Sequence, residues 1–261
     1  PKLPEIIENV YSPIFSINPS LFYIVTADPI QFINDYHFDS DEDTTPVGLA
    51  GRSLKQLADS HPEIHDFLFS LAVSALTNFA TNPFDESYLV HYSHFHLVSS
   101  YWEVLVKHHY EDESLPVLEF MDQLLPLFQA SIEEPESIAP DAPSLYLIQS
   151  AMLLIISRCN PYINLKLDST FPINPVPINP IFAEVCIALL DSESPLVQYF
   201  ATFSINMILN NSYETDPNLL SVCAPNALKI VNFIIEYARI YCNKSALCVV
   251  SIFLKNKEIL N

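Results

Sequence analysis

Glycine is almost absent from this chain of 261 residues, which contains only Gly48 and Gly51. Tight hairpins, phosphate-binding loops and dinucleotide-binding turns depend on glycine, because a side chain would block their backbone angles or the approach of a ligand. The scarcity therefore argues against nucleotide-binding folds. It also argues against the glycine-flanked nucleophile of many hydrolases.

Basic residues are scarce as well: Lys and Arg total 11 against 31 Asp and Glu, which gives a formal net charge of −20. A surface of this sign repels phosphate backbones and anionic lipids, and it attracts basic partners in a salt-dependent way. We therefore expect no direct binding of nucleic acid. For each acidic cluster a simpler interpretation stays open, in which the charge only keeps an apolar chain in solution.

The five cysteines form no CxxC pair, and an odd number of thiols in apolar contexts favours a reducing compartment. The most apolar stretches, 145–156 and 227–253, are too short or are interrupted by charged and amide residues. We therefore expect no membrane insertion. No targeting segment is visible, and because the chain opens on Pro1 we expect a fragment of a longer protein.

Proline and apolar residues are plentiful, and they are arranged as in helical proteins. Hydrophobic residues make up 50% of the chain, and its 21 prolines fall between apolar stretches or at their first turns. Asp28 and Pro29 are typical of an N-cap and a first helical position, so we expect a short helix there with Phe32 packed inward.

Apolar residues at helical spacing follow in successive pairs of segments. The predicted pairs span roughly residues 46–81, 85–128, 144–190 and 195–241, with a long insertion loop at 159–180. The last helix of these pairs is expected over roughly 218–241. In the first helix, from 46 to about 58, the residues expected to point inward are Val47, Leu49, Ala50, Leu54 and Leu57. Since one amphipathic pair cannot bury its apolar stripe alone, stacking between pairs would supply the core. We predict an all-α fold, a right-handed α-solenoid of HEAT- or armadillo-like helix pairs that forms a single array over residues 1–261.

No catalytic, cofactor or metal site is indicated. His61 and His65 have the spacing of a helical metal pair, but Glu63 stands one position later than in an HExxH motif and no third ligand is suggested. We therefore expect no enzyme activity, although catalytic groups that meet only in space stay open. We expect His94 to be half-buried and His96 to lie on a polar helix face with Ser99.

Concentrated polar chemistry is confined to acidic loops, of which one contains Asp39, Asp41, Glu42 and Asp43. A second, proline-rich acidic stretch at 133–143 is also predicted to be a loop. Such carboxylates would face Lys- or Arg-rich partners, and arginine can pair with them through two parallel hydrogen bonds.

Several short stretches resemble the importin-β superfamily in an order that extends to about Asn211. They are Asp28-Pro29-Ile30-Gln31-Phe32-Ile33, the helix beginning Pro46-Val47, Leu97-Val98-Ser99-Ser100, the segment 121–128, and Leu189-Leu190-Asp191 leading into Pro195. The chain is most similar to the import carriers around importin seven and importin eight. It departs from them at Asn34-Asp35-Tyr36, where members often carry basic residues.

The resemblance implies a central portion of a HEAT-repeat superhelix that carries basic protein cargo through nuclear pores. Ran GTPase and nucleoporins would be further partners, and the protein would shuttle between cytoplasm and nucleus. On this hypothesis Asp39, Asp41, Glu42 and Asp43 bind cargo or Ran. Two alternatives stay open, an exportin of the same superfamily and a generic armadillo-like scaffold for protein–protein interaction.

Overall fold

The computed structural model describes residues 3–17, 19–33, 45–82, 88–112, 117–163, 178–212, 217–241 and 246–255, and in these ranges it is helical without any strand. The predicted all-α class is confirmed. The chain divides into two compact units, which we call the N-terminal unit (Pro1–Ile155) and the C-terminal unit (Ile156–Asn261). The division falls within helix α10, Ala142–Ile163.

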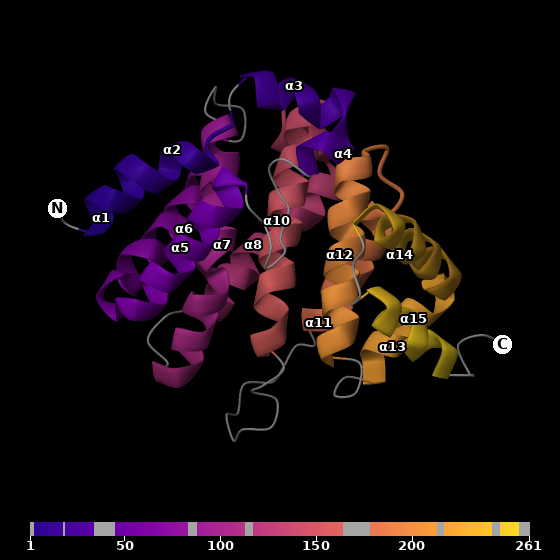
Figure 1. Ribbon diagram of the computed structural model, residues 1–261. Coiled ribbons are helices and arrows are strands. Elements are labelled where there is room, and N and C mark those ends of the chain that lie inside the picture. The colour runs from indigo at the N-terminus through magenta and orange to yellow at the C-terminus, as the bar shows by residue number, and fades with distance from the viewer. Residues whose placement is uncertain are drawn as a thin grey trace. The chain divides into compact units, whose positions relative to one another are not determined.

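The elements are shown in Figure 1. Those before α10 are α1 (Leu3–Ile6), the π-helical η1 (Ile7–Tyr11), α2 (Ser12–Phe15), α3 (Pro19–Ala27), α4 (Pro29–Phe32), α5 (Pro46–Ser60), the 3₁₀ turn η3 (Pro62–Ile64), α6 (His65–Thr81), α7 (Tyr88–Asp112), α8 (Val117–Glu133) and α9 (Pro135–Ile138). Those after α10 are α11 (Ile178–Leu189), α12 (Pro195–Ser212), α13 (Pro217–Cys223), the 3₁₀ turn η5 (Ala224–Asn226), α14 (Ala227–Tyr241) and α15 (Ala246–Lys255).

Helix α7 is central to the N-terminal unit, because α2, α5 and α6 all pack against it (Figure 1). Its aromatic side chains fill the core. Trp102 lies 4.6 Å, between ring centroids, from Phe120 of α8, and Phe95 meets Phe79 of α6 edge to face at 5.9 Å. All four rings are almost completely buried, and aromatic burial of this extent is a large stabilising contribution.

The short helix α4 begins as its sequence predicts. The Asp28 carboxylate accepts a hydrogen bond of 2.9 Å from the backbone N–H of Gln31, and Pro29 occupies the first turn. Phe32 is completely buried, so both the predicted cap and the predicted packing of Phe32 are confirmed. Thr45 caps α5 in the same way, because its hydroxyl accepts a hydrogen bond of 3.1 Å from the N–H of Gly48.

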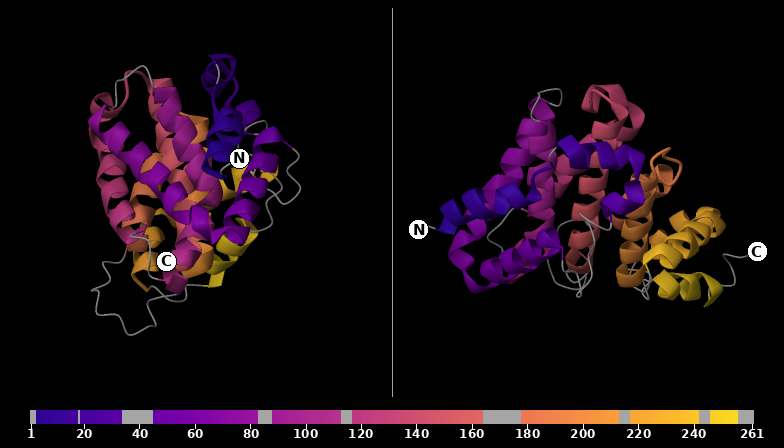
Figure 2. Two further views of the ribbon diagram at one scale, coloured as in Figure 1. Left: turned by 90° about the vertical axis from the view of Figure 1, so that its left-hand side faces the viewer. Right: turned by 45° about the horizontal axis from the view of Figure 1, so that its top comes forward.

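In the C-terminal unit, α12 packs against α11, α14 and α15, and α14 packs against α15 (Figure 2, orange to yellow). The predicted helix 218–241 is interrupted by η5, which contains Pro225. Proline has no backbone N–H and its ring crowds the preceding turn, which accounts for a break there. The residues that form the buried stripe continue at helical spacing across this break: Leu219, Cys223, Ala227, Ile230, Ile234 and Tyr237.

The face that α5 buries differs from the predicted one. Val47, Ala50, Leu54 and Ala58 are buried, whereas Leu49 was expected to point inward and is 51% exposed. The buried positions are three or four residues apart, so they form one stripe, and Leu49 lies beside it rather than on it. The burial of two alanines fits the close approach of α5 to α7.

Two predicted loops contain helix. Residues 135–138 of the predicted loop 133–143 form α9, whose Ile138 is buried. In the predicted insertion loop 159–180, α10 continues through Ile163 and α11 begins at Ile178. Helix α9 forms within the predicted loop 133–143 because a short helical turn brings the apolar side chain of Ile138 into the core.

Candidate functional site

The four carboxylates predicted to bind a partner, Asp39, Asp41, Glu42 and Asp43, lie outside the described residues. The described residues end at Ile33 before them and resume at Thr45 after them. The Asp28 cap and the buried Phe32 fix α4 before them, and the Thr45 cap fixes the start of α5 after them. The structure therefore describes the helices that come before and after these four residues in the sequence.

Acidic and basic side chains differ in how exposed they are. All acidic side chains whose accessibility the structure describes are exposed: Glu5, Glu8, Asp28, Asp59, Glu63, Asp66, Glu133, Glu134, Glu136, Asp141, Glu184, Asp191, Glu193 and Glu236. The basic side chains described in the same way are half-buried: Arg52, Lys55, Arg158 and Lys229. The described surface therefore presents negative charge to a partner.

The densest group of these carboxylates lies where α8 leads through α9 into α10. Asp141 caps α10, since its carboxylate accepts hydrogen bonds from the Ser144 N–H (2.9 Å) and hydroxyl (2.6 Å). Glu133 and Glu134 stand at the C-terminal end of α8, where the helix dipole disfavours negative charge. Their position therefore does not help to stabilise α8.

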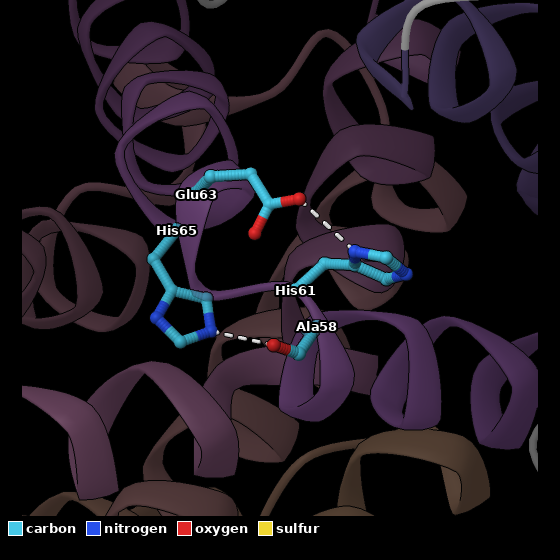
Figure 3. A network of polar contacts seen from close by, with 4 residues as sticks. All are labelled: Ala58, His61, Glu63 and His65. Carbon is cyan, nitrogen blue, oxygen red and sulfur yellow. Dashed lines mark hydrogen bonds and ion pairs between the residues drawn. The ribbon is translucent and has the colours of Figure 1, made fainter.

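His61 and His65 do not converge on one point. The ring Nδ1–H of His61 donates to the Glu63 carboxylate at 3.0 Å, whereas Nε2–H of the buried His65 donates to the Ala58 carbonyl at 2.7 Å (Figure 3). Among the residues that the structure describes, no three His, Cys, Asp or Glu side chains gather as metal ligands. The corner instead joins α5 to α6 through side-chain hydrogen bonds.

Glu63 is exposed, and the pKa of its carboxyl is held below the ordinary value. The largest cause is a hydrogen bond from backbone N–H, followed by the hydrogen bond from His61. Both favour the ionised form. Glu63 lies in the first turn of η3, and its pKa is far from that of a general acid or base at neutral pH.

The prediction that His96 lies on a polar face is wrong. His96 and Ser99 are both buried, because α2 covers this side of α7 and the Phe15 ring meets the His96 ring edge to face at 5.1 Å. The Ser99 hydroxyl donates to the His96 carbonyl at 2.7 Å, which satisfies it within the helix. His94 is half-buried, as predicted.

Sequence reasoning missed a group of aromatic side chains in the C-terminal unit, which we call the aromatic cluster: Tyr199, Phe203, Phe233 and Tyr237. Tyr199 and Phe203 of α12 stack with an interplanar angle of 16°, and Phe233 and Tyr237 of α14 stack with one of 12°. Tyr199 and Tyr237 join the two pairs edge to face at 5.5 Å. The signal for this cluster was the four-residue spacing within each pair.

Hydrogen bonds hold the aromatic cluster in place at the start of α12. The Tyr237 hydroxyl donates to the Pro195 carbonyl at 3.1 Å and lies 3.3 Å from the Gln198 side-chain oxygen. Nearby on α14, Lys229 forms an ion pair of 2.7 Å with Asp191. Lys229 is thus neutralised by the turn that precedes α12.

Cys186 and Cys223 are buried in the C-terminal unit. Burial raises the pKa of the Cys186 thiol, with a further contribution from Cys223, and it raises the pKa of Cys223 to about 12. Since the thiolate is the reactive form, neither thiol is suited to nucleophilic catalysis.

One described stretch, Asn218–Tyr237, is long and apolar enough to cross a membrane by length and composition alone. Core helices of water-soluble proteins pass the same test. In this stretch the 3₁₀ turn at 224–226 interrupts the helix, and Lys229 and Glu236 lie within it.

A comparison of the chain with family models, curated proteins and solved structures found no match.

Proposed function

We propose that this chain is a segment of a nuclear transport receptor of the importin type, built as a right-handed α-solenoid of HEAT- or armadillo-like helix pairs. It binds basic protein cargo, Ran GTPase or both through its acidic surface, and it interacts with nucleoporins while shuttling between cytoplasm and nucleus. It performs no catalysis and holds no cofactor.

The observation that carries the proposal is the separation of charge described above. Exposed carboxylates occur on helices throughout both units, while the described basic side chains are half-buried. Carboxylates that face water are well solvated, so they destabilise the unbound protein little. When a Lys- or Arg-rich segment binds, they form ion pairs and hydrogen bonds with it. The resemblance to importins in the order of short stretches adds the transport role.

The test is a pull-down of the protein on a panel of basic cargo proteins, with and without Ran-GTP, at two salt concentrations. Binding that weakens as salt rises, together with release of cargo by Ran-GTP, is the expected result. Cargo binding that requires Ran-GTP would instead identify an exportin. Binding indifferent to Ran-GTP would leave a helical scaffold.

The role of Asp39, Asp41, Glu42 and Asp43 is tested by reversing their charges together. We expect weaker binding of a basic partner and a smaller salt dependence, because fewer ion pairs form. The matched control reverses four other exposed carboxylates of the N-terminal unit, Glu5, Glu8, Asp59 and Asp66. If the two sets of changes reduce affinity equally, the four residues have no special place in binding.

A further inference from the structure

The aromatic cluster offers more than the packing of two helices requires. Tyr199, Phe203 and Phe233 are each only half-buried, whereas the aromatic rings of the N-terminal core are almost completely buried. Ring surface that stays in contact with water contributes less to folding than buried surface does. The cluster therefore leaves preorganised aromatic surface available to a ligand.

The shape of the cluster is fixed before any ligand binds. Each stacked pair lies along one helix at a spacing of four residues, and the edge-to-face contact of Tyr199 with Tyr237 links the helices. The buried Tyr237 is further held by its hydrogen bond to the Pro195 carbonyl. A ligand would lose little of its binding energy to ordering these rings.

The charges around the cluster select the sign of the ligand. Glu236 is exposed and lies three residues after Phe233, which places it on the neighbouring surface of α14. Glu193 is also exposed and lies two residues before Pro195, whose carbonyl accepts a hydrogen bond from the Tyr237 hydroxyl. Among the basic side chains of α14, the structure describes that of Lys229, and it is paired with Asp191.

We propose that the aromatic cluster recognises an arginine side chain of a basic protein segment, with the guanidinium lying on an aromatic face and pairing with Glu236 or Glu193. The proposal rests on the proposed function insofar as the partner is a basic protein segment, and it does not depend on Ran. Arginine is favoured over lysine because its planar, weakly hydrated guanidinium stacks on rings and pairs with a carboxylate through two hydrogen bonds.

The experiment measures the affinity of the whole chain for three peptides of equal length. One contains arginines, one has lysine at every arginine position, and one is neutral and contains phenylalanines. We expect the arginine peptide to bind roughly three- to thirtyfold more tightly than the lysine peptide. The ratio of the two affinities does not depend on the fraction of protein that is active.

Three variants complete the test. Tyr199→Leu and Phe203→Leu keep an apolar side chain in place, and each should bring the arginine-to-lysine ratio close to one while leaving the lysine peptide nearly unaffected. Leu228→Ala removes an apolar side chain that is 76% exposed on α14, the helix that carries Phe233 and Tyr237, and it should leave the ratio unchanged. Circular dichroism verifies that each variant is folded.

The outcomes separate this inference from the proposed function. Equal affinity for the arginine and lysine peptides overturns the inference and leaves the binding of basic segments standing. Tighter binding of the neutral phenylalanine peptide also overturns it, since the cluster would then be an apolar docking site. Failure of both basic peptides to bind overturns the proposed function together with the inference.

Discussion

The aromatic residues around α7 in the N-terminal unit and those of the aromatic cluster in the C-terminal unit differ in how completely they are buried. In the N-terminal unit the rings of Phe79, Phe95, Trp102 and Phe120 are enclosed around α7, and they form the centre of the core. In the C-terminal unit Phe182, Phe200 and Phe253 are also completely buried. Between α12 and α14, however, Tyr199, Phe203 and Phe233 are only half-buried. The first arrangement favours stability, whereas the second favours binding.

Buried polar groups of the N-terminal unit are hydrogen-bonded to the backbone. Around α7 they are tied to the backbone of other helices or of α7 itself: the Tyr101 hydroxyl donates to the Leu68 carbonyl at 2.9 Å, and His65 donates to Ala58 at 2.7 Å. Burial also raises the pKa of Tyr101. Such satisfied groups make a core specific, because an alternative packing would leave them without partners.

The same substitution in the two units should separate these roles most strongly. Phe95→Ala should lower the free energy of unfolding by about 3–5 kcal/mol, because it leaves a cavity in a closed core. Phe203→Ala should lower it by about 1–2 kcal/mol, since that ring is less completely buried. Denaturant unfolding followed by circular dichroism measures both. Equal decreases in the free energy of unfolding would mean that the aromatic cluster belongs to the hydrophobic core.

Removal of the α4 cap should destabilise the N-terminal unit and leave the stability of the C-terminal unit unchanged. Asp28→Ala removes the acceptor for the Gln31 N–H and should cost about 1 kcal/mol. Fluorescence of Trp102, the only tryptophan of the chain, follows the N-terminal unit, and labelling of Cys186 and Cys223 follows the C-terminal unit. A change in the labelling rate equal to the change seen by fluorescence would show that the units unfold together. Asp59→Ala, an exposed change within α5, is the control.

A glycine substitution should stabilise the N-terminal unit slightly. A Cβ atom at Gly51 would lie 3.4 Å from the Ser100 hydroxyl oxygen and 3.6 Å from its Cβ, which are ordinary contacts. Gly51→Ala should therefore raise the free energy of unfolding by about 0.5–1 kcal/mol, as expected for a helix interior. The larger Gly51→Leu should lower it, because α5 would be pushed away from α7. A midpoint measured by Trp102 fluorescence distinguishes these results.

The smallest expected effect concerns Glu63 at the α5–α6 corner. Because its pKa is lower in the folded protein, its ionised form stabilises the fold above the unfolded pKa, and this contribution is lost as pH falls through the folded pKa. The melting temperatures of the wild type and Glu63→Gln should therefore differ at neutral pH and converge in acid. His61→Asn should reproduce part of the difference. A constant difference at all pH values would exclude this ionisation as the cause.

Local signals in the sequence predicted local structure well. Asp28-Pro29 predicted a cap and a first turn, and the spacing of apolar residues predicted the helices of both units, because these features depend on neighbours along the chain. Which residues of a helix form its buried stripe depends on the other helices that pack against it. Leu49 and His96 were therefore assigned to the wrong side of their helices. The sequence around each residue does not show where the covering helix, α7 or α2, will lie.

The candidate site was less accessible to prediction for a similar reason. The acidic side chains were expected at the surface and are exposed wherever their accessibility is described, whereas the aromatic cluster depends on two helices that meet across 30 residues or more of sequence. Spacing alone gave each stacked pair. It did not give the contact between Tyr199 and Tyr237, which makes them one surface.

The central place of α7 has a consequence for synthesis on the ribosome. Helices α2, α5 and α6 precede α7 in the chain, and they bury their apolar stripes against it. At about 5–20 residues per second, several seconds of translation separate the appearance of α2 from that of α7. During this interval Phe15 and Leu54 lack their final neighbours, so the nascent chain presents apolar surface that molecular chaperones recognise.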